Sequence, residues 1–383
     1  MKTFHCIATC AAGLEALVGK ELRQLGIECQ VENGRARFVG DMETIATANL
    51  WLRTADRIKI VVGEFKAETF DGLFEQVKAI PWEDYLPMDA NFPVAGKSIK
   101  STLFSVSDCQ AITKKAIVNR LSDVYHRYGR LPESGAKFPI EVSLLKNHVM
   151  LTLDTTGDSL FKRGYRVDKG GAPLKETLAA ALVMLTNWRY DRPFVDPTCG
   201  SGTICIEAAM IGLNIAPGFN RRFLCEDWDW VDNTVFEKVR TEADEKACYD
   251  RHLNIMGTDI DARMIDIAKR NAEEAGLAGD ILFKQMRLQD FTTKEDYGVI
   301  VSNPPYGERL NDKEQVEMLY TEMGDVFRPL KTWSQYFLTS DLQFEKFYGK
   351  KATKKRKLYN GALRCDYFQY WGERPPRRTR EEG

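Results

Sequence analysis

Between residues 192 and 339, short apolar runs alternate with segments whose apolar residues recur every three to four positions. This alternation of strand and helix predicts a doubly wound, mostly parallel α/β sheet. The predicted strands are 192–196, 253–258, 281–286, 297–302 and 335–339, and the predicted helices are 202–213, 262–276 and 314–330. The Asn360-Gly361 pair lies between two further strand patterns, so the sequence also predicts an antiparallel hairpin at the end of this sheet.

The first of these strands leads into the run Asp196-Pro197-Thr198-Cys199-Gly200-Ser201-Gly202, which opens a helix. Glycines at such a turn let the backbone approach a ligand closely. The third glycine of a dinucleotide fingerprint and the Lys-Ser/Thr of a phosphate-binding loop are absent. Asp196 would repel phosphates but suits a cationic ammonium group, which favours an amino-acid-bearing nucleotide. The alternative is a tight strand-to-helix turn with no ligand.

Acidic residues follow the next two strands. Asp259 ends the second strand, where a carboxylate can accept both hydroxyls of a ribose. Asp261 precedes a helix and is expected to be its N-cap. Asp290 follows the third strand and could accept a hydrogen bond from an adenine amino group. A solvated loop aspartate is the alternative for Asp290.

Asn303-Pro304-Pro305-Tyr306 comes directly after a fully apolar strand and is the most specific signal in the chain. Two consecutive prolines fix the backbone and cannot continue a strand ladder. The amide oxygen of Asn303 and the carbonyl of Pro304 can then accept both protons of one exocyclic amine, while Tyr306 offers a flat face to a base. The alternative is a rigid turn without chemistry.

Taken together, these motifs resemble those of the class I S-adenosylmethionine-dependent methyltransferases that modify exocyclic amines. Residues 161–166 (Phe-Lys-Arg-Gly-Tyr-Arg) and 173–179 (Pro-Leu-Lys-Glu-Thr-Leu-Ala) look like the start of the catalytic domain of THUMP-containing RNA methyltransferases. Residues 303–309 are similar to the corresponding run in the guanine-N2 methyltransferases of large-subunit ribosomal RNA. The resemblance covers nearly the whole chain, although its specific motifs lie after residue 160.

The resemblance implies both the fold and the roles of the site residues. It implies an α/β class: a Rossmann-like methyltransferase domain at 158–383 with the C-terminal hairpin, preceded by an α+β ferredoxin-like part at 1–55 and a THUMP RNA-binding domain at 56–157. The implied cofactor is S-adenosylmethionine, with Asp196, Pro197, Cys199, Gly200, Gly202, Thr203, Asp259, Ile260, Asp290, Asn303, Lys175 and Glu176 as its ligands. The implied catalytic residues are Asn303, Pro304, Pro305 and Tyr306.

The first 160 residues carry no sharp motif and are interpreted from their periodicity as two small α+β units. The predicted strands are 4–9, 58–65, 92–100 and a pair within 138–153 that turns at Lys146-Asn147. Helices are predicted at 13–25, at 69–80 and after a cap at Ser107 or Asp108. Residues 214–250 form an insertion with a helix through Val235 and Val239. Its Trp228 and Trp230 could pack in a core or line a path for RNA.

The net charge of −1 conceals an uneven distribution. Residues 1–160 hold 19 basic and 20 acidic side chains, residues 161–345 hold 23 and 31, and residues 346–383 hold 12 and 4. This pattern excludes a protein that coats RNA indiscriminately and favours local phosphate contacts. The candidate contacts are Lys114, Lys115, Arg120 and Arg127, the run 350–357 with Lys354, Lys355, Arg356 and Lys357, and the run 374–380. A solvated basic face is the alternative for the first four.

Composition excludes several other classes of protein. The chain has nine cysteines without a Cys-x-x-Cys pair and only four histidines, so we expect no metal site and reduced thiols. No apolar run is long enough for a membrane span, and we expect a cytoplasmic protein. The resemblance to the guanine-N2 methyltransferases implies methylation of guanine N2 in ribosomal RNA. A transfer-RNA guanine-N2 methyltransferase, a DNA adenine-N6 methyltransferase and a non-catalytic RNA-binding assembly factor remain alternatives, and the oligomeric state is unknown.

Overall fold

The computed structural model describes residues 2–127, 129–167, 174–306 and 313–376. Its internal contacts divide the chain into two compact units. Unit 1 combines residues 1–10, 18–160 and 222–241, and unit 2 combines residues 11–17, 161–221 and 242–383. Residues 222–241 therefore fold with the N-terminal part of the chain, although the sequence on both sides of them belongs to unit 2.

Unit 1 is built on one seven-stranded sheet with the order β2-β3-β1-β4-β7-β6-β5. Its strands are β1 Phe4–Thr9, β2 Cys29–Glu32, β3 Arg35–Gly40, β4 Arg57–Lys66, β5 Val94–Ile99, β6 Ile140–Leu145 and β7 His148–Asp154. The long central strand β4 pairs with β1 along one edge and with β7 along the other. The two small units predicted from the sequence therefore share a single sheet. The predicted turn at Lys146-Asn147 is confirmed, and both residues have positive φ.

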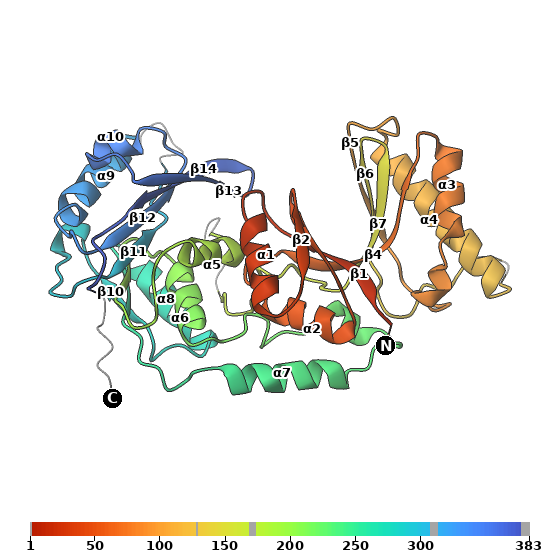
Figure 1. Cartoon of the computed structure of the whole chain (residues 1–383), viewed down its shortest axis with the longest axis horizontal. Helices are drawn as coiled ribbons and strands as arrows, with labels where there is room; N and C mark the ends of the chain where they lie inside the picture. The colour runs from red at the N-terminus through yellow and green to blue at the C-terminus, as the bar shows by residue number, and fades with distance from the viewer. Residues whose placement is uncertain (1, 128, 168–173, 307–312, 377–383) are drawn as a thin grey trace. The chain divides into compact units, whose positions relative to one another are not determined.

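Helices α1 Glu15–Gln24, α2 Met42–Trp51, α3 Phe70–Ala79 and α4 Val106–Val124 belong wholly or in part to unit 1, as does the first part of α7 Thr234–Lys246. Figure 1 shows α3 and α4 side by side on one face of the β5–β6–β7 part of the sheet. The predicted cap of α4 at Ser107 or Asp108 is wrong, because the carbonyl of Ser105 already accepts the first helical hydrogen bond, from the Cys109 N–H at 3.0 Å. Asp108 instead lies in the first turn, where its charge complements the helix dipole.

Unit 2 has a second seven-stranded sheet with the order β10-β9-β8-β11-β12-β14-β13. Its strands are β8 Phe194–Asp196, β9 Ile255–Asp259, β10 Leu282–Gln285, β11 Val299–Ser302, β12 Ser334–Thr339, β13 Lys354–Asn360 and β14 Leu363–Tyr370. The first five strands in chain order are parallel, and β14 is antiparallel to both β12 and β13. The predicted doubly wound sheet and its C-terminal hairpin are confirmed.

Helices flank this second sheet. They are α5 Glu176–Met184, α6 Thr203–Gly212, α8 Ala262–Glu274, α9 Lys313–Phe327 and α10 Phe344–Tyr348. The side chain of Asp261 accepts a hydrogen bond from the backbone N–H of Arg263, so its predicted role as the N-cap of α8 is confirmed. A core of buried apolar side chains, including Ile300, Phe327 and Phe337, fills the space between α9, α10 and the sheet. None of the helices in the described ranges is long and apolar enough to cross a membrane.

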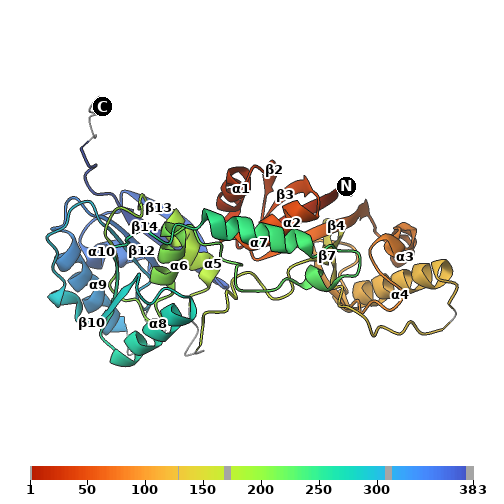
Figure 2. The same cartoon turned by 90° about the horizontal axis from the view of Figure 1, so that it is seen from below.

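The insertion packs against unit 1 through its two tryptophans. The Trp228 ring stacks on Phe138 with centroids 4.9 Å apart, and its indole N–H donates to the carbonyl of Lys137. The indole N–H of Trp230 donates to the carbonyl of Tyr85. Helix α7 (Thr234–Lys246) follows and lies beside α2 (Figure 2), where Lys238 and Glu43 form an ion pair at 2.7 Å. Trp228 is therefore packed in a core, which is the first of the two predicted alternatives.

We expect Trp228→Ala to destabilise unit 1 by about 3–5 kcal/mol, because the change removes a large buried ring and an indole hydrogen bond. Urea denaturation followed by circular dichroism would measure the loss. Trp371→Ala is the matched control, since the Trp371 side chain is 55% exposed. A Trp228→Ala variant that unfolds at the same urea concentration as the control would contradict the packing role.

Candidate functional site

The order of the strands in unit 2 creates one point at which the chain reverses direction across the sheet. From β8 the chain proceeds to β9 and β10 on one side, then returns to β11 and β12 on the other. Ligands of open parallel sheets bind outside the carboxyl ends of the strands at such a switch point. The three sequence motifs follow β8, β9 and β11, so they meet at this edge.

The glycine turn after β8 has a backbone that other residues would adopt only under strain. Gly200 and Gly202 have φ values of +50° and +81°. A Cβ on Gly202 would lie 2.8 Å from the ring of Phe283 and 3.0 Å from Ala268, so this position is closed to a side chain. A Cβ on Gly200 would meet only Met264, at 3.8 Å, which leaves the backbone of Gly200 accessible.

The carboxylate of Asp259 holds the glycine turn in place. Its Oδ2 accepts the N–H of Gly200 at 3.0 Å, and its Oδ1 accepts the N–H of Asp261 at 3.0 Å. A carboxylate has about four acceptor positions, so two remain available for further donors. The next side chain, Ile260, is 68% exposed. Asp290 lies in the short 3₁₀ turn Leu288–Asp290 after β10 and is also exposed.

A hydrogen bond joins the two principal motifs. The hydroxyl of Thr198, in the glycine turn, lies 2.5 Å from the hydroxyl of Ser302, the last residue of β11. Asn303 follows immediately, so it is next to the turn. Strand β9 also holds Pro197 and Cys199 of the glycine turn. The N–H of Cys199 donates to the carbonyl of Thr258, and the hydroxyl of Thr258 donates to the carbonyl of Pro197.

Two hydrogen bonds fix the Asn303-Pro304-Pro305-Tyr306 turn, one within the turn and one from α9. The hydroxyl of Tyr306 donates to Oδ1 of Asn303, and the buried Tyr320 of α9 donates to the carbonyl of Pro305 at 3.0 Å. Burial raises the pKa of Tyr306, so its hydroxyl keeps its proton and stays a donor. Pro304 is buried and Asn303 is half-buried. Gly307, Glu308 and Arg309, which extend the resemblance, lie outside the described residues.

Asp196 lies beneath the glycine turn and is only 1% exposed. Burial raises the pKa of Asp196 to about 8, and repulsion from Asp259 acts in the same direction. Hydrogen bonds from the Thr198 N–H and from Ser302 oppose the rise in this pKa. Asp196 therefore keeps its proton at neutral pH, and a positive charge nearby would favour its ionised form.

The segment before α5 adds a residue that the sequence interpretation did not single out. Arg166 donates from Nε to Glu176 at 3.0 Å and from Nη2 to the hydroxyl of Thr203 at 3.3 Å. Its Nη1 is buried without a hydrogen-bond partner within the part of the chain that the structure describes. The only sequence signal for Arg166 was its place in the Phe161–Arg166 run. Lys175 is exposed, with its ammonium 4.9 Å from the centre of the Phe161 ring.

The segment is fixed by a second ion pair inside unit 2. Arg163 and Glu207 of α6 are both almost fully buried and lie 3.3 Å apart. The hydroxyl of Tyr165 donates to the same carboxylate at 3.0 Å. Because a buried charge that loses its partner is strongly destabilising, this pair holds the segment firmly against α6.

Most of the basic residues predicted to contact RNA have protein partners. In α4, Lys114 pairs with Glu133 at 2.8 Å and Arg120 pairs with Glu83, while Lys115 is exposed. Arg127 is also exposed, but it lies beyond the end of α4 at Val124. The predicted residues of β13 lie on the outermost strand of the second sheet. There Lys355 pairs with Glu345, Arg356 donates to the carbonyl of Gly13, Lys357 lies over the Tyr359 ring, and Lys354 is exposed. Residues 377–380 lie outside the described residues.

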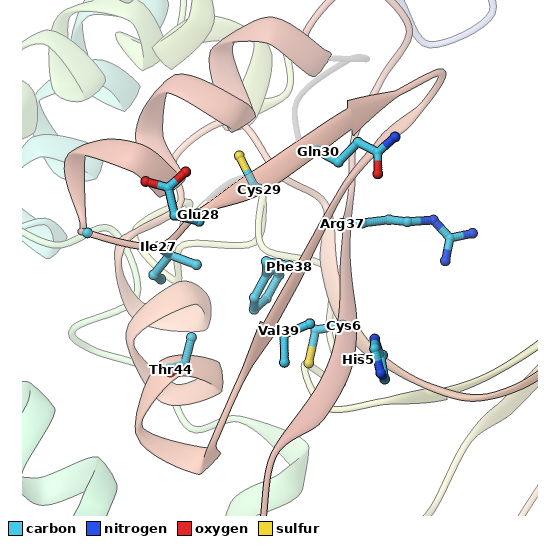
Figure 3. A pocket seen from close by; sticks show the side chains of 11 residues that line it. His5, Cys6, Ile27, Glu28, Cys29, Gln30, Arg37, Phe38, Val39 and Thr44 are labelled. Carbon is cyan, nitrogen blue, oxygen red and sulfur yellow. The ribbon is translucent and has the colours of Figure 1, made fainter.

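A separate hollow of about 690 Å³ lies in unit 1, between β1, β3 and the chain that leads into β2 (Figure 3). None of the predicted site residues lines it. Its most prominent cation, Arg37, is neutralised by Glu32 and Glu64. Across the described ranges no group of three or more histidine, cysteine or acidic side chains is arranged to hold a metal ion.

Comparison with protein families matches three consecutive stretches of the chain. Residues 5–59 match the RlmL ferredoxin-like domain, residues 67–154 match the THUMP domain, and residues 163–369 match the RMKL-like methyltransferase domain. The last match covers more than half of the chain. The chain belongs to this methyltransferase family.

Relatives over the full length support the assignment. The Bacillus subtilis protein YpsC, named an RNA methyltransferase, is 59% identical over 383 residues, with complete coverage of both chains. The large-subunit ribosomal RNA methyltransferase K/L of Syntrophotalea carbinolica is 32% identical over 95% of this chain, which corresponds to 53% of its own length.

Two solved structures share the complete fold. The methyltransferase SMU.472, complexed with SAH, has 59% identity and a TM-score of 0.94, and the match covers 98% of this chain and all of that one. A Listeria monocytogenes protein described as an N6-adenine-specific DNA methylase has 63% identity and a TM-score of 0.94, with 97% of each chain covered. The ferredoxin-like, THUMP and methyltransferase architecture expected from the sequence is confirmed.

The raised pKa of Asp196 gives a testable dependence of stability on pH. The folded state holds this proton up to about pH 8, whereas the unfolded chain releases it near pH 4. The free energy of unfolding should therefore fall as pH rises through this window, with a contribution from Asp196 of up to about 1.4 kcal/mol per pH unit. Asp196→Asn should remove this contribution, as measured by urea denaturation at several pH values.

The control is Asp191→Asn, since Asp191 is exposed in the same unit. It should show the pH dependence of the unsubstituted protein. Equal slopes for all three proteins would mean that Asp196 is ionised in the folded state.

Proposed function

We propose that this protein transfers a methyl group from S-adenosylmethionine to an exocyclic amine of a base in RNA, and that the amine is N2 of a guanine in large-subunit ribosomal RNA. The observation that carries the proposal is the Thr198–Ser302 hydrogen bond, because it couples the glycine turn directly to Asn303. A methyl donor held by the turn and an amine held by Asn303 would then be neighbours.

S-adenosylmethionine is the cofactor, as the methyltransferase family and the SAH-complexed homologue indicate. The described residues fit its polar ends. The buried Nη1 of Arg166, which has no hydrogen-bond partner among the described residues, would bind the carboxylate of the methionine part. The accessible backbone of Gly200 leaves room for the same part. The two acceptor positions left on Asp259 suit the ribose hydroxyls.

Of the other predicted ligands, Lys175 stays a prediction, and we assign Asn303 to the amine of the substrate rather than to the cofactor. The rest fall into two groups. Ile260 and Asp290 are exposed at the edge next to Asp259, where we propose that they contact the adenine ring and its amino group. Several residues would act by shaping the turn rather than by touching the ligand, because they are buried or are bonded to protein groups. These are Asp196, Pro197, Cys199, Gly202, Thr203 and Glu176.

The proposed chemistry is a direct in-line transfer. The bond from the amine nitrogen to the methyl carbon would form as the S–CH₃ bond breaks, and the amine would then release one proton to water. The cofactor supplies a methyl group on a positively charged sulfur, which is a good leaving group. The nucleophile needs assistance, because the lone pair of guanine N2 is delocalised into the ring. Hydrogen bonds from the amine to Oδ1 of Asn303 and to the carbonyl of Pro304 would localise this lone pair and direct it. Positioning of this kind can lower a barrier by about 7–11 kcal/mol.

Tyr306 would support the same step. Its hydroxyl occupies one lone pair of the Asn303 oxygen and leaves the second for the amine. This bond also fixes the orientation of the Asn303 amide, since the oxygen must face the donor. The target base has to be unpaired or flipped to reach the pocket, and the Tyr306 ring is the surface proposed to stack on it.

The names of relatives support two candidate substrates, a base in RNA and an adenine in DNA. RNA is supported by the name of YpsC, and large-subunit ribosomal RNA by the name of methyltransferase K/L. The second candidate is adenine N6 of DNA, which the description of the Listeria monocytogenes protein favours. Both bases present an exocyclic amine, so the Asn303 site is compatible with either. The THUMP domain favours RNA.

A transfer assay separates the candidates. The protein is incubated with methyl-labelled S-adenosylmethionine and with ribosomal RNA, transfer RNA or DNA, and the digested nucleosides are identified by mass spectrometry. Labelled N2-methylguanosine from ribosomal RNA is the expected product. Labelled N6-methyladenine from DNA, with nothing on RNA, would overturn the proposal.

Asn303→Ala should lower kcat by about 100- to 1000-fold, the loss typical of removing one positioned hydrogen-bond group from a transition state. The Kd for S-adenosylmethionine, measured by calorimetry, should change little because the glycine turn and Asp259 remain. Asn254→Ala is the control, since Asn254 is exposed. Equal losses of rate and cofactor affinity would count against Asn303 as the amine acceptor.

A further inference from the structure

The loop between β5 and α4 holds a large apolar side chain in solvent. Phe104 is 83% exposed, and nearby Ile99 and Leu145 are 53% and 47% exposed. Ile99 and Leu145 are register partners at the ends of β5 and β6. Single exposed apolar residues are common, but three at one end of a sheet indicate an interaction surface. We call residues 99–104 and 145–147 the β5 tip; it lies at the end of β5 in Figure 1.

The β5 tip is fixed by hydrogen bonds. Asn147 accepts the Thr102 N–H on its side-chain oxygen at 2.7 Å and donates its own N–H to the hydroxyl of Ser101 at 3.0 Å. Leu103 is buried, and its carbonyl accepts the hydroxyl of Ser98 at 2.7 Å. Phe104 follows this anchor directly. Its backbone is thus held in place before any partner arrives, which lowers the entropic cost of binding.

Two lysines of the tip form no ion pair with the described residues, although one carboxylate lies beside the tip, that of Glu68, which accepts a hydrogen bond from the side chain of Asn147 at 3.2 Å. Lys100 and Lys146 are exposed, and neither takes part in the ion pairs of that part of the chain. The nearby Lys97, by contrast, pairs with Glu141 at 2.9 Å. Uncompensated ammonium groups beside an exposed aromatic ring favour a polyanion with flat bases.

A hollow of about 620 Å³ begins at the tip. Ile99, Leu145 and Lys146 line it from one side, and Asn33 and Arg35 line it from the other. Its volume is within the range of small-ligand sites. The arginines within it are neutralised, since Arg35 pairs with Glu32 and Arg37 pairs with Glu64. The uncompensated positive charge therefore belongs to the lysines at the tip.

We propose that the β5 tip binds an unpaired nucleotide of RNA, with its base stacked on Phe104 and its phosphates near Lys100 and Lys146. RNA as the partner rests on the proposed function, whereas the position of the contact rests on the exposed ring and the two uncompensated lysines. The exposed apolar residues would also suit a second copy of the chain or another protein. The lysines favour the nucleic acid, because an apolar protein partner would leave their charge without a counterpart.

The test is the affinity of the full-length protein for a short fluorescent single-stranded oligoribonucleotide, measured by anisotropy. Phe104→Ala should weaken binding about 5- to 100-fold, the range of one lost base stack. Phe104→Trp should bind the oligoribonucleotide about as tightly as the unsubstituted protein does, because this change keeps a flat aromatic ring. Leu342→Ala is the control, since Leu342 is 77% exposed in unit 2. A duplex of the same sequence should show little effect of Phe104→Ala, because its bases are not free to stack.

The contribution of the two lysines is measured by how strongly the affinity for RNA depends on salt concentration. Lys100→Asn with Lys146→Asn should reduce the slope of log affinity against log salt by about 0.7 for each phosphate that is no longer neutralised by a lysine. Asparagine is chosen because both positions have positive φ, which asparagine tolerates.

The proposal is overturned if Phe104→Ala binds the single strand as the unsubstituted protein does, or if Phe104→Trp is as weak as Phe104→Ala. It is also overturned if sedimentation shows that Phe104→Ala dissociates a dimer while RNA affinity stays constant. The binding assay contains no methyl donor, so these outcomes are distinct from failure of the methyl-transfer assay.

Discussion

The parallel pairing of β8 with β11 is the constraint on which the site depends. These strands are far apart in sequence, and their pairing places the residues that follow them at one edge of the sheet. The Thr198–Ser302 hydrogen bond then joins the two turns directly. Asp259, from the neighbouring strand β9, fixes the glycine turn from the other side. Three local motifs thus become one site because the strand order reverses at β8.

The sequence alone could predict that the three motifs meet at one edge of the sheet, because each motif is a few consecutive residues at the end of an apolar strand. It failed where the information is distributed. Strands β2 and β3 and helix α2 were not predicted. Helix α2 has no exposed polar face, because each of its residues is buried or half-buried, and even the polar Asn49 is buried. Arg166 was not singled out, since its meaning depends on contacts with Glu176 and Thr203 that sequence spacing does not reveal. The joining of two predicted sheets through β4 is likewise a long-range pairing.

The tryptophans of the insertion show how a segment inside a catalytic domain can become part of another unit. Trp228 stacks on Phe138, and the indole N–H groups of Trp228 and Trp230 donate to the carbonyls of Lys137 and Tyr85. Burying these rings without such acceptors would be costly. Several basic side chains also have their hydrogen-bond acceptors inside the protein. Lys114, Arg120 and Arg356 each donate to a protein group. Phosphate contacts are therefore more easily assigned to lysines outside the ion pairs of the described residues than to basic runs in the sequence.

In the proposed reaction, an RNA base receives a methyl group on its exocyclic amine at Asn303. The most direct measurement is mass spectrometry of ribosomal RNA nucleosides from a strain that lacks this protein, compared with the parent strain and with a strain that carries the Asn303→Ala variant. We expect one N2-methylguanosine to be lost from large-subunit RNA in both altered strains. An unchanged set of methylated guanosines in the strain without the protein would contradict it.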